Sequence, residues 1–217
     1  MTPHRIPHIL VAAVLLAFLA VPAKAQENDG ITGRIQKQYE SLRSFKADIV
    51  QELTNGANKE TRTRKGHIAF CSPGHVRWET TEPEPELIVA GDGPVWDYFA
   101  DEEAAYKYPR EQVMGGKTML RFLSGQARLD EDFWVEEHAE GPLVRLELIP
   151  KEPEPNLVKA EAWVTDEMAM LTRVKIVDFF GNINDVRLEN LVLNPDLPDS
   201  LFAFTPPKGT EILDNTQ

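Results

Sequence analysis

The sequence predicts a mainly β (α+β) fold: an open, incomplete antiparallel β-barrel of about eleven strands with a helical lid over an apolar cavity. Short stretches that alternate apolar and polar residues follow one another from Phe45 onward, separated by turn signals such as Asn55-Gly56. Strands joined by short turns form an antiparallel sheet with one apolar face, and a sheet of this length must curl. Its concave face needs a cover, and two segments without alternation, residues 29–42 and 113–130, are available for it. A two-sheet sandwich is the competing arrangement.

The first 25 residues predict the compartment. A cationic start precedes an apolar run over residues 9–21, and the small residues Ala23 and Ala25 match the positions that signal peptidase reads. The run is too short for a membrane-spanning helix. We therefore expect residues 1–25 to be a cleaved signal peptide and residues 26–217 to form a single exported domain. Because no cysteine lies at the cleavage site, we expect a soluble mature chain that is not lipidated.

Composition excludes several classes of function. The chain carries 35 acidic against 23 basic residues and a formal net charge of −12 at pH 7, so it offers no cationic surface for nucleic acid or anionic membranes. Cys71 is the only cysteine, which excludes an internal disulfide and leaves stability to the core. No phosphate loop or dinucleotide fingerprint occurs. We expect no cofactor, no nucleic-acid partner and a monomer.

The elements follow in chain order from their periodicity. Apolar residues at the spacing of Ile31, Ile35 and Tyr39 predict a helix in the first segment without alternation. Alternation then predicts strands up to residue 108. In the second segment without alternation we expect one or two short helices. Strands resume after it, at residues 132–138, 142–150, 157–164, 171–178 and 184–193.

Candidate catalytic and metal-binding patterns are weak. His67, Cys71 and His75 share strand parity. Their spacing matches no common zinc pattern, and the turn signal Pro73-Gly74 breaks their common face. The run from Glu82 to Glu86 interleaves acids with prolines, which is typical of a solvated connection. We therefore predict no metal site and no enzyme. A glycoside or ester hydrolase that uses the abundant carboxylates is the remote alternative.

Aromatic and methionine side chains on the predicted strands and on the helical insertion favour an apolar binding cavity. Methionine adapts to irregular apolar partners, and aromatic rings supply a broad contact area. We expect the cavity to be lined by Ile49, Val76, Trp78, Val89, Trp96, Met119, Leu120, Phe122 and Val164. We expect the lid to contribute Ile35, Tyr39, Leu120 and Phe122. A register error of one residue would turn a lining position outward.

Several segments together resemble one known family in their order and spacing. The strand–turn–strand run GHIAFCSPGHVRWE, residues 66–79, is followed by TEP at 81–83, LIVAGDG at 87–93 and VWDY at 95–98. LRSFKA at residues 42–47, with Gln51 after it, and FAFTPPKG at residues 202–209 lie near the two ends of the mature chain. The whole pattern resembles the LolA family of periplasmic lipoprotein carriers.

The resemblance implies a fold and a function. The family's fold is an open antiparallel barrel of about eleven strands with helices over its mouth. Its members take triacylated lipoproteins from an ATP-driven inner-membrane complex, without catalysis, and deliver them across the periplasm to an outer-membrane lipoprotein receptor. We therefore expect a periplasmic carrier that binds the acyl chains of lipoproteins. The alternative is a lipid- or glycolipid-binding sensor or regulator on the same open-barrel fold, although such relatives usually carry a second domain.

One position departs from the family pattern. Many members carry an arginine immediately before the proline that is Pro73 here, and that arginine is understood to tie the lid shut. Ser72 stands at this position. A serine hydroxyl makes shorter-reaching hydrogen bonds that carry no charge. We therefore expect apolar contacts of Ile35, Leu120 and Phe122 to hold the lid closed.

Overall fold

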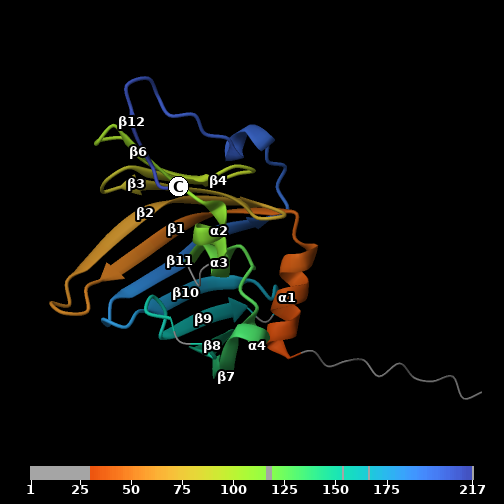
Figure 1. Cartoon of the computed structure of the whole chain (residues 1–217). Coiled ribbons are helices and arrows are strands. Elements are labelled where there is room, and N and C mark those ends of the chain that lie inside the picture. The colour runs from red at the N-terminus through yellow and green to blue at the C-terminus, as the bar shows by residue number, and fades with distance from the viewer. Residues whose placement is uncertain (1–29, 116–118, 153, 166, 217) are drawn as a thin grey trace, which may run out of the picture.

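A single curved sheet dominates the computed structural model, which describes residues 30–115, 119–152, 154–165 and 167–216 (Figure 1). The expected signal peptide, residues 1–25, lies outside the described residues. The strands are β1 (Ser44–Thr54), β2 (Thr61–Cys71), β3 (His75–Glu82), β4 (Glu86–Ala90), β5 (Val95–Phe99), β6 (Ala104–Tyr108), β7 (Phe133–Glu140), β8 (Leu143–Pro150), β9 (Lys159–Thr165), β10 (Leu171–Val177), β11 (Ile183–Leu193) and β12 (Glu211–Asp214). Their order across the sheet is β12-β6-β5-β4-β3-β2-β1-β11-β10-β9-β8-β7.

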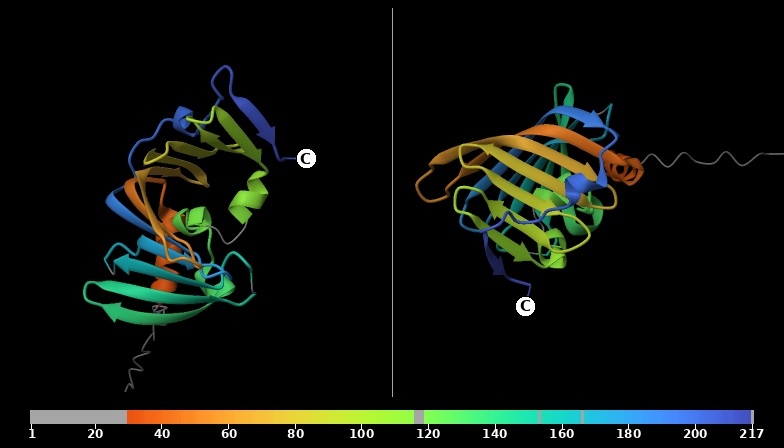
Figure 2. Two further views of the ribbon diagram at one scale, coloured as in Figure 1. Left: turned by 90° about the vertical axis from the view of Figure 1, so that its left-hand side faces the viewer. Right: turned by 90° about the horizontal axis from the view of Figure 1, so that it is seen from above.

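The sheet curls without closing. Its edge strands β12 and β7 stand at opposite ends of the strand order and are not hydrogen-bonded to each other. Viewed toward the β-hairpin ends, the sheet forms an open curve with helices inside it (Figure 2). The fold class predicted from the sequence is therefore confirmed, with an open sheet in place of two packed sheets.

Short helices lie inside this curve and across one of its ends. They are α1 (Ile31–Ser41), α2 (Arg110–Gly115), α3 (Met119–Leu123) and α4 (Leu129–Asp132), and a 3₁₀ helix, η1 (Asp199–Phe202), lies near the C-terminus. Helices α3 and α4 lie within the curve, and α1 stands across the end where β1 begins (Figures 1 and 2). The expected N-terminal helix is confirmed over its described part. The described residues between β6 and β7 form three helices, α2 to α4, rather than the one or two expected.

The C-terminal strand departs from the expected topology. We expected about eleven antiparallel strands, whereas the described residues form twelve and β12 pairs in parallel with β6. The chain leaves β11, carries η1 across the outer side of β3, and returns to the free edge of β6 (Figure 1). The segment is short and its alternation is weak, so periodicity alone did not reveal it.

Period-two alternation determines which side chains face inward. Along β1, Phe45, Ala47 and Ile49 are buried, whereas Lys46 between them is exposed. Directly opposite on β2, Phe70 stacks on Phe45 with ring centroids 5.3 Å apart. Each large apolar side chain buried in this way contributes about 1.5–3 kcal/mol to folding. The inward row of each strand thus builds an apolar concave face.

Candidate binding site on the concave face

Seven of the nine residues predicted to line a cavity lie on the concave side, together with the lid. The buried members of one apolar cluster include Ile49, Val76, Trp78, Met119, Leu120, Phe122 and Val164. Ile35 and Tyr39, the two predicted lid residues from α1, belong to the same cluster. The sheet lining and the helices over it therefore share one continuous apolar interior. In the lid, Phe122 packs against Phe133 of β7, with ring centroids 5.5 Å apart.

Val89 and Trp96 are placed differently from the prediction. They are cross-strand partners on β4 and β5, and they lie on the convex face, because Ile88 and Ala90 oppose the inward residues Trp78 and Val76. Both line a surface hollow with the C-terminal segment, where Phe204 packs against Trp96 at a centroid distance of 5.9 Å. The prediction for these two residues is wrong because Leu87, Ile88 and Val89 are all apolar, which hides strand parity.

Polar contacts of Arg110, called the Arg110 latch below, join α2 to the sheet. We refer to α1 and the helices α2 to α4 together as the lid. The Arg110 guanidinium, at the start of α2, donates hydrogen bonds to the backbone carbonyls of Gly74 (2.8 Å) and Gly91. These carbonyls lie in the β2–β3 and β4–β5 turns. Ser72, at the family's arginine position, is exposed, and its backbone N–H donates to the Arg43 carbonyl (2.8 Å). Here, therefore, an arginine reaches from the lid to the turn that follows Ser72.

Sequence reasoning missed Arg110. Its two carbonyl partners lie 36 and 19 residues earlier in the chain, so no local pattern connects them. The available signal was an arginine three residues before the predicted helical insertion, combined with turns whose glycines leave backbone carbonyls accessible. A second arginine, Arg121, stabilises the end of the lid by donating to the Gln126 carbonyl and the Asp132 carboxylate, at 3.1 and 2.9 Å.

The concave face also carries a charged cluster. Arg64 on β2 forms an ion pair with Glu86 on β4, whose side chain is 10% exposed. Burial and the neighbouring Glu86 carboxyl raise the pKa of Asp97 on β5 to about 7, and Arg64 opposes this shift. The prediction that the run from Glu82 to Glu86 is a solvated connection is therefore wrong for Glu86. The proline-rich part ends one residue earlier, and Glu86 begins an inward-facing strand.

The raised pKa of Asp97 predicts a pH-dependent stability. In the unfolded chain this carboxyl loses its proton near pH 4, whereas the folded chain retains it until about pH 7. The folded state therefore binds more protons in this window, and its stability falls as the pH rises from 4 to 7. Asp97→Asn should consequently be more stable than the parent at pH 8, by about 1 kcal/mol once partial solvent screening is allowed for, with the gain absent at pH 4.

Urea unfolding at pH 4, 6 and 8 measures this difference. The matched control is Asp101→Asn, which neutralises an exposed carboxylate in the adjoining β5–β6 turn. We expect its stability relative to the parent to stay constant over the same pH range. A constant difference for Asp97→Asn as well would contradict the buried-carboxyl interpretation.

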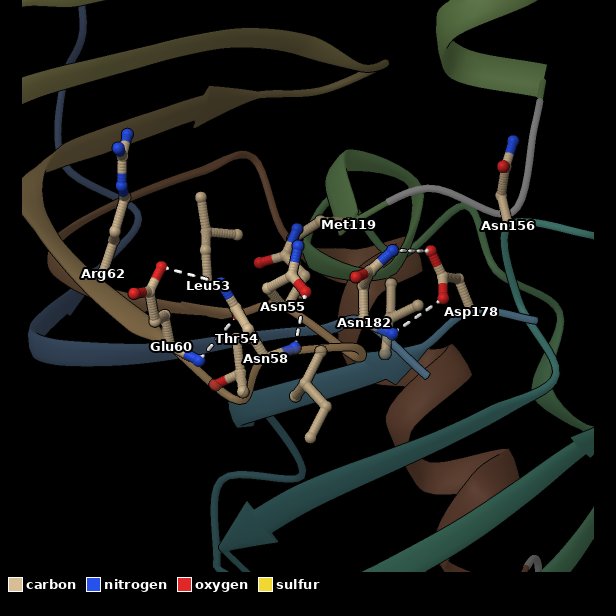
Figure 3. A pocket seen from close by; sticks show the side chains of 13 residues that line it. Leu53, Thr54, Asn55, Asn58, Glu60, Arg62, Met119, Asn156, Asp178 and Asn182 are labelled. Carbon is tan, nitrogen blue, oxygen red and sulfur yellow. Dashed lines mark hydrogen bonds between the residues drawn. The ribbon is translucent and has the colours of Figure 1, made fainter. Parts of the chain in front are cut away.

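A pocket of about 690 Å³ opens at the hairpin end of the sheet (Figure 3). This end lies away from α1 (Figure 1). The β1–β2 and β10–β11 hairpins form its walls, and Met119 reaches it from α3 (Figure 3). Its lining is Leu53, Thr54, Asn55, Asn58, Glu60, Arg62, Met119, Asn156, Ile176, Asp178, Asn182, Ile183 and Asn184. This pocket mixes apolar, amide and charged side chains, in contrast to the purely apolar cavity expected. Of the predicted lining residues, Met119 reaches it.

Two phenylalanines lie on the turn beside this pocket. Phe179 and Phe180, in the β10–β11 turn, are 72% and 75% exposed, and their rings make an edge contact with centroids 5.6 Å apart. Asp178 stabilises the turn, because its carboxylate accepts hydrogen bonds from the backbone and side-chain amides of Asn182 at 2.8 and 2.7 Å. The hairpin end thus presents apolar surface next to an amide-rich opening.

The residues considered for metal binding have other partners. His67 Nδ1 lies 2.8 Å from Asp48, and His75 Nε2 lies 2.7 Å from Asp92. Within the described ranges, no group of three or more His, Cys, Asp or Glu side chains is arranged to hold a metal ion. Over the same residues, no helix has both the length and the apolarity needed to span a membrane.

The geometry defines an open-barrel protein whose apolar concave face is covered by short helices. Hydrogen bonds from Arg110 and Arg121 hold these helices in place. Comparison with known proteins makes the assignment specific. The chain belongs to the LolA family, because residues 40–205 match the family model described as "Outer membrane lipoprotein carrier protein LolA". The family resemblance read from the sequence motifs is therefore confirmed.

Relatives extend the match over most of the chain. An outer-membrane lipoprotein carrier protein of Legionella pneumophila (strain Lens) is 32% identical over 180 residues, which cover 82% of this chain and 87% of that protein. One from Nitrosomonas europaea is 28% identical and covers 96% and 98% of the two chains. A crystal structure of an uncharacterized conserved protein from Thermus thermophilus shares the fold, with a TM-score of 0.55, 14% identity and coverage of 85% and 97%.

Proposed function

We propose that this chain is a periplasmic carrier that binds the acyl chains of triacylated lipoproteins. It receives them from an ATP-driven inner-membrane complex and transfers them to an outer-membrane receptor. The observation that carries this proposal is that the lid residues and the sheet lining share one buried apolar cluster beneath a sheet that stays open. Membership of the LolA family supports the same assignment.

The energetics of acyl chains explain why such a carrier is needed. Each buried methylene contributes about 0.8 kcal/mol, so two or three chains of about sixteen carbons represent roughly 25–40 kcal/mol of exposure to water. In the closed protein, Leu120 and Phe122 cover the concave face. Acyl chains that displace these side chains exchange one apolar contact for another. The net free-energy change is then modest, and binding stays reversible enough for transfer.

The Arg110 latch supplies the polar part of lid closure in this proposal. The lid contacts expected from the sequence were apolar, and Ile35, Leu120 and Phe122 do lie in the buried cluster. Arg110 adds directional bonds to Gly74 and Gly91, which lie on turns at the rim of the sheet. Such bonds fix one closed geometry and can break without exposing apolar surface at the latch itself.

Arg110→Ala should therefore loosen the lid. A hydrogen bond with a charged donor contributes about 1.5–3 kcal/mol when shielded, and the half-buried Arg110 donates two of them. We expect amide hydrogen exchange in α2 to accelerate by about tenfold or more, equivalent to about 1.4 kcal/mol of opening free energy. Arg128→Ala, which removes the exposed Arg128–Glu131 pair at the start of α4, should leave this exchange almost unchanged. Equal exchange in both variants would rule out the latch.

Lipoprotein release tests the proposed function directly. Spheroplasts of the cell that produces this chain, supplied with the purified mature protein, should release acylated lipoproteins into the soluble fraction. The released lipoprotein should co-purify with the carrier, whereas a lipoprotein whose acylated cysteine is replaced by serine should not. Recovery of a free lipid or glycolipid in place of lipoproteins would favour a sensor or regulator. The absence of any acylated species would overturn the carrier proposal.

A further inference from the structure

Gln51 is a polar side chain in an inward row that is otherwise apolar. It follows Phe45, Ala47 and Ile49 on the concave face of β1, and it is 7% exposed. Leu53 is the next inward residue and lines the pocket at the hairpin end. A leucine or valine at position 51 would continue the apolar row, so the buried amide needs a physical explanation.

Only part of the Gln51 amide is satisfied by the protein. Its Nε2 donates a hydrogen bond to Oδ1 of Asn184 (2.9 Å) on the neighbouring strand β11. Its Oε1 is buried and has no hydrogen-bond partner among the described residues. Buried acceptors are nearly always paired, because the loss of hydration is not otherwise compensated. The unpaired Oε1 is therefore an acceptor to which a bound molecule could donate a hydrogen bond.

The position of this acceptor specifies where such a molecule would lie. Asn184, the partner of Gln51, lines the hairpin-end pocket together with Leu53. In the register of β1 and β11, Leu53 pairs with Asn184, and Gln51 with Val186 is the next inward-facing pair toward the interior. Gln51 thus stands between the polar pocket and the apolar interior, directly opposite Arg64 of β2, whose guanidinium forms an ion pair with Glu86. An amphiphile that enters through the pocket would place its polar–apolar junction at this level.

We propose that Gln51 Oε1 accepts a hydrogen bond from an amide N–H at the polar–apolar junction of the cargo lipid, where a fatty acyl chain is joined to nitrogen. This inference rests on the proposed carrier function and deepens it. A carbonyl oxygen can pair only with a donor, so an ester at the same place leaves it unsatisfied. A carboxylate there would place negative charge against the acceptor. The site therefore distinguishes N-acylated lipids from lipids that carry ester-linked chains alone.

A pair of matched probes tests the amide preference. N-palmitoylglycine methyl ester and methyl O-palmitoylglycolate differ in one position, where an N–H is replaced by an oxygen. Calorimetry with the mature protein should show about fivefold to tenfold tighter binding of the amide, as expected for one buried hydrogen bond. Gln51→Leu should bind both probes with equal affinity. Equal binding of the two probes by the parent protein, or an amide preference that persists in Gln51→Leu, would overturn the proposal.

Three controls keep the result interpretable. Asn156→Leu replaces an exposed amide elsewhere in the same pocket and should retain the amide preference. Gln51→Met offers a second apolar replacement of similar length if the leucine variant does not fold, and the comparison of probes in the parent protein needs no variant. Failure of the parent to bind either probe would overturn the carrier function together with this inference. Equal binding of both probes would overturn this inference alone.

Discussion

Phe122→Ala is expected to lower the free energy of unfolding by about 3–5 kcal/mol and at the same time to increase the affinity for acyl chains. The stability loss follows from burial: the Phe122 side chain is 1% exposed and packs against Phe133. Truncation of a buried phenylalanine removes its apolar contacts and leaves a cavity, and both effects destabilise the folded chain.

The expected gain in affinity follows from the position of Phe122 in the lid. In the proposed mechanism, acyl chains bind only after the lid side chains leave the concave face, so the closed lid would compete with the cargo. Apparent affinity scales with the fraction of molecules in the binding-competent state. Weakening the closed lid raises that fraction, and an emptied site also admits hydrocarbon. A fluorescent sixteen-carbon acyl probe measures the affinity, and urea unfolding measures the stability.

Phe202→Ala is the matched control for this variant. Phe202 is also a buried phenylalanine, at 5% exposure, but it lies in η1 at the convex-side hollow and contacts His75 at a centroid distance of 5.8 Å. Its truncation should cost stability without changing acyl affinity. If the affinity of Phe122→Ala falls together with its stability, then Phe122 is only a structural core residue and the lid interpretation fails.

Much of the sheet could be predicted because its determinants are local. Turn signals such as Asn55-Gly56 and Pro73-Gly74 mark hairpin ends, and the alternation between them sets which side chains face the core. Ala160, Ala162 and Val164 alternate strictly, and all three are fully buried on β9. Where one face is apolar and the other polar, a strand's orientation can be read from the sequence without knowledge of its neighbours.

The errors occur where this local information is lost. Val89 belongs to a run of apolar residues on β4, and the C-terminal segment buries its outer face as well. A strand covered on both faces has no polar side to indicate its orientation. Trp96 was misplaced for the same reason, because its convex-side partner Phe204 lies more than a hundred residues further along the chain.

The polar parts of the site depend on contacts that are distant in sequence. The Arg64–Glu86–Asp97 cluster joins three strands, and the Arg110 latch joins the lid to two separate turns. Each of these residues is of a charged type that usually lies on the protein surface. Their roles emerge only when the curled sheet and its lid bring them together. Gln51 entered the sequence analysis only as part of a family motif, and its unpaired oxygen required the structure.

Gly125→Ala is expected to destabilise the chain by about 3 kcal/mol or more, because it combines backbone strain with a steric clash. Gly125 follows α3 with a φ of +70°, and its N–H donates to the Phe122 carbonyl (3.0 Å), as in a helix C-terminal cap. A Cβ atom there would lie 2.2 Å from Cδ1 of Tyr39 and 2.6 Å from its Cβ. Tyr39 is buried in the cluster shared by lid and sheet, so it has little room to yield.

Gly141→Ala separates the two contributions. Gly141 has a similar φ of +61°, in the β7–β8 turn, but a Cβ atom built there meets no other atom within 4 Å. Its replacement should cost about 1–2 kcal/mol, which is the left-handed strain alone. The stability that Gly125→Ala loses beyond the loss in Gly141→Ala is due to the clash with Tyr39. This difference measures how tightly α1 is held against the end of α3. If the two variants lose equal stability, Tyr39 moves freely and α1 does not restrain the lid. If Gly125→Ala loses more and also binds the acyl probe more tightly, α1 and the insertion open as one unit.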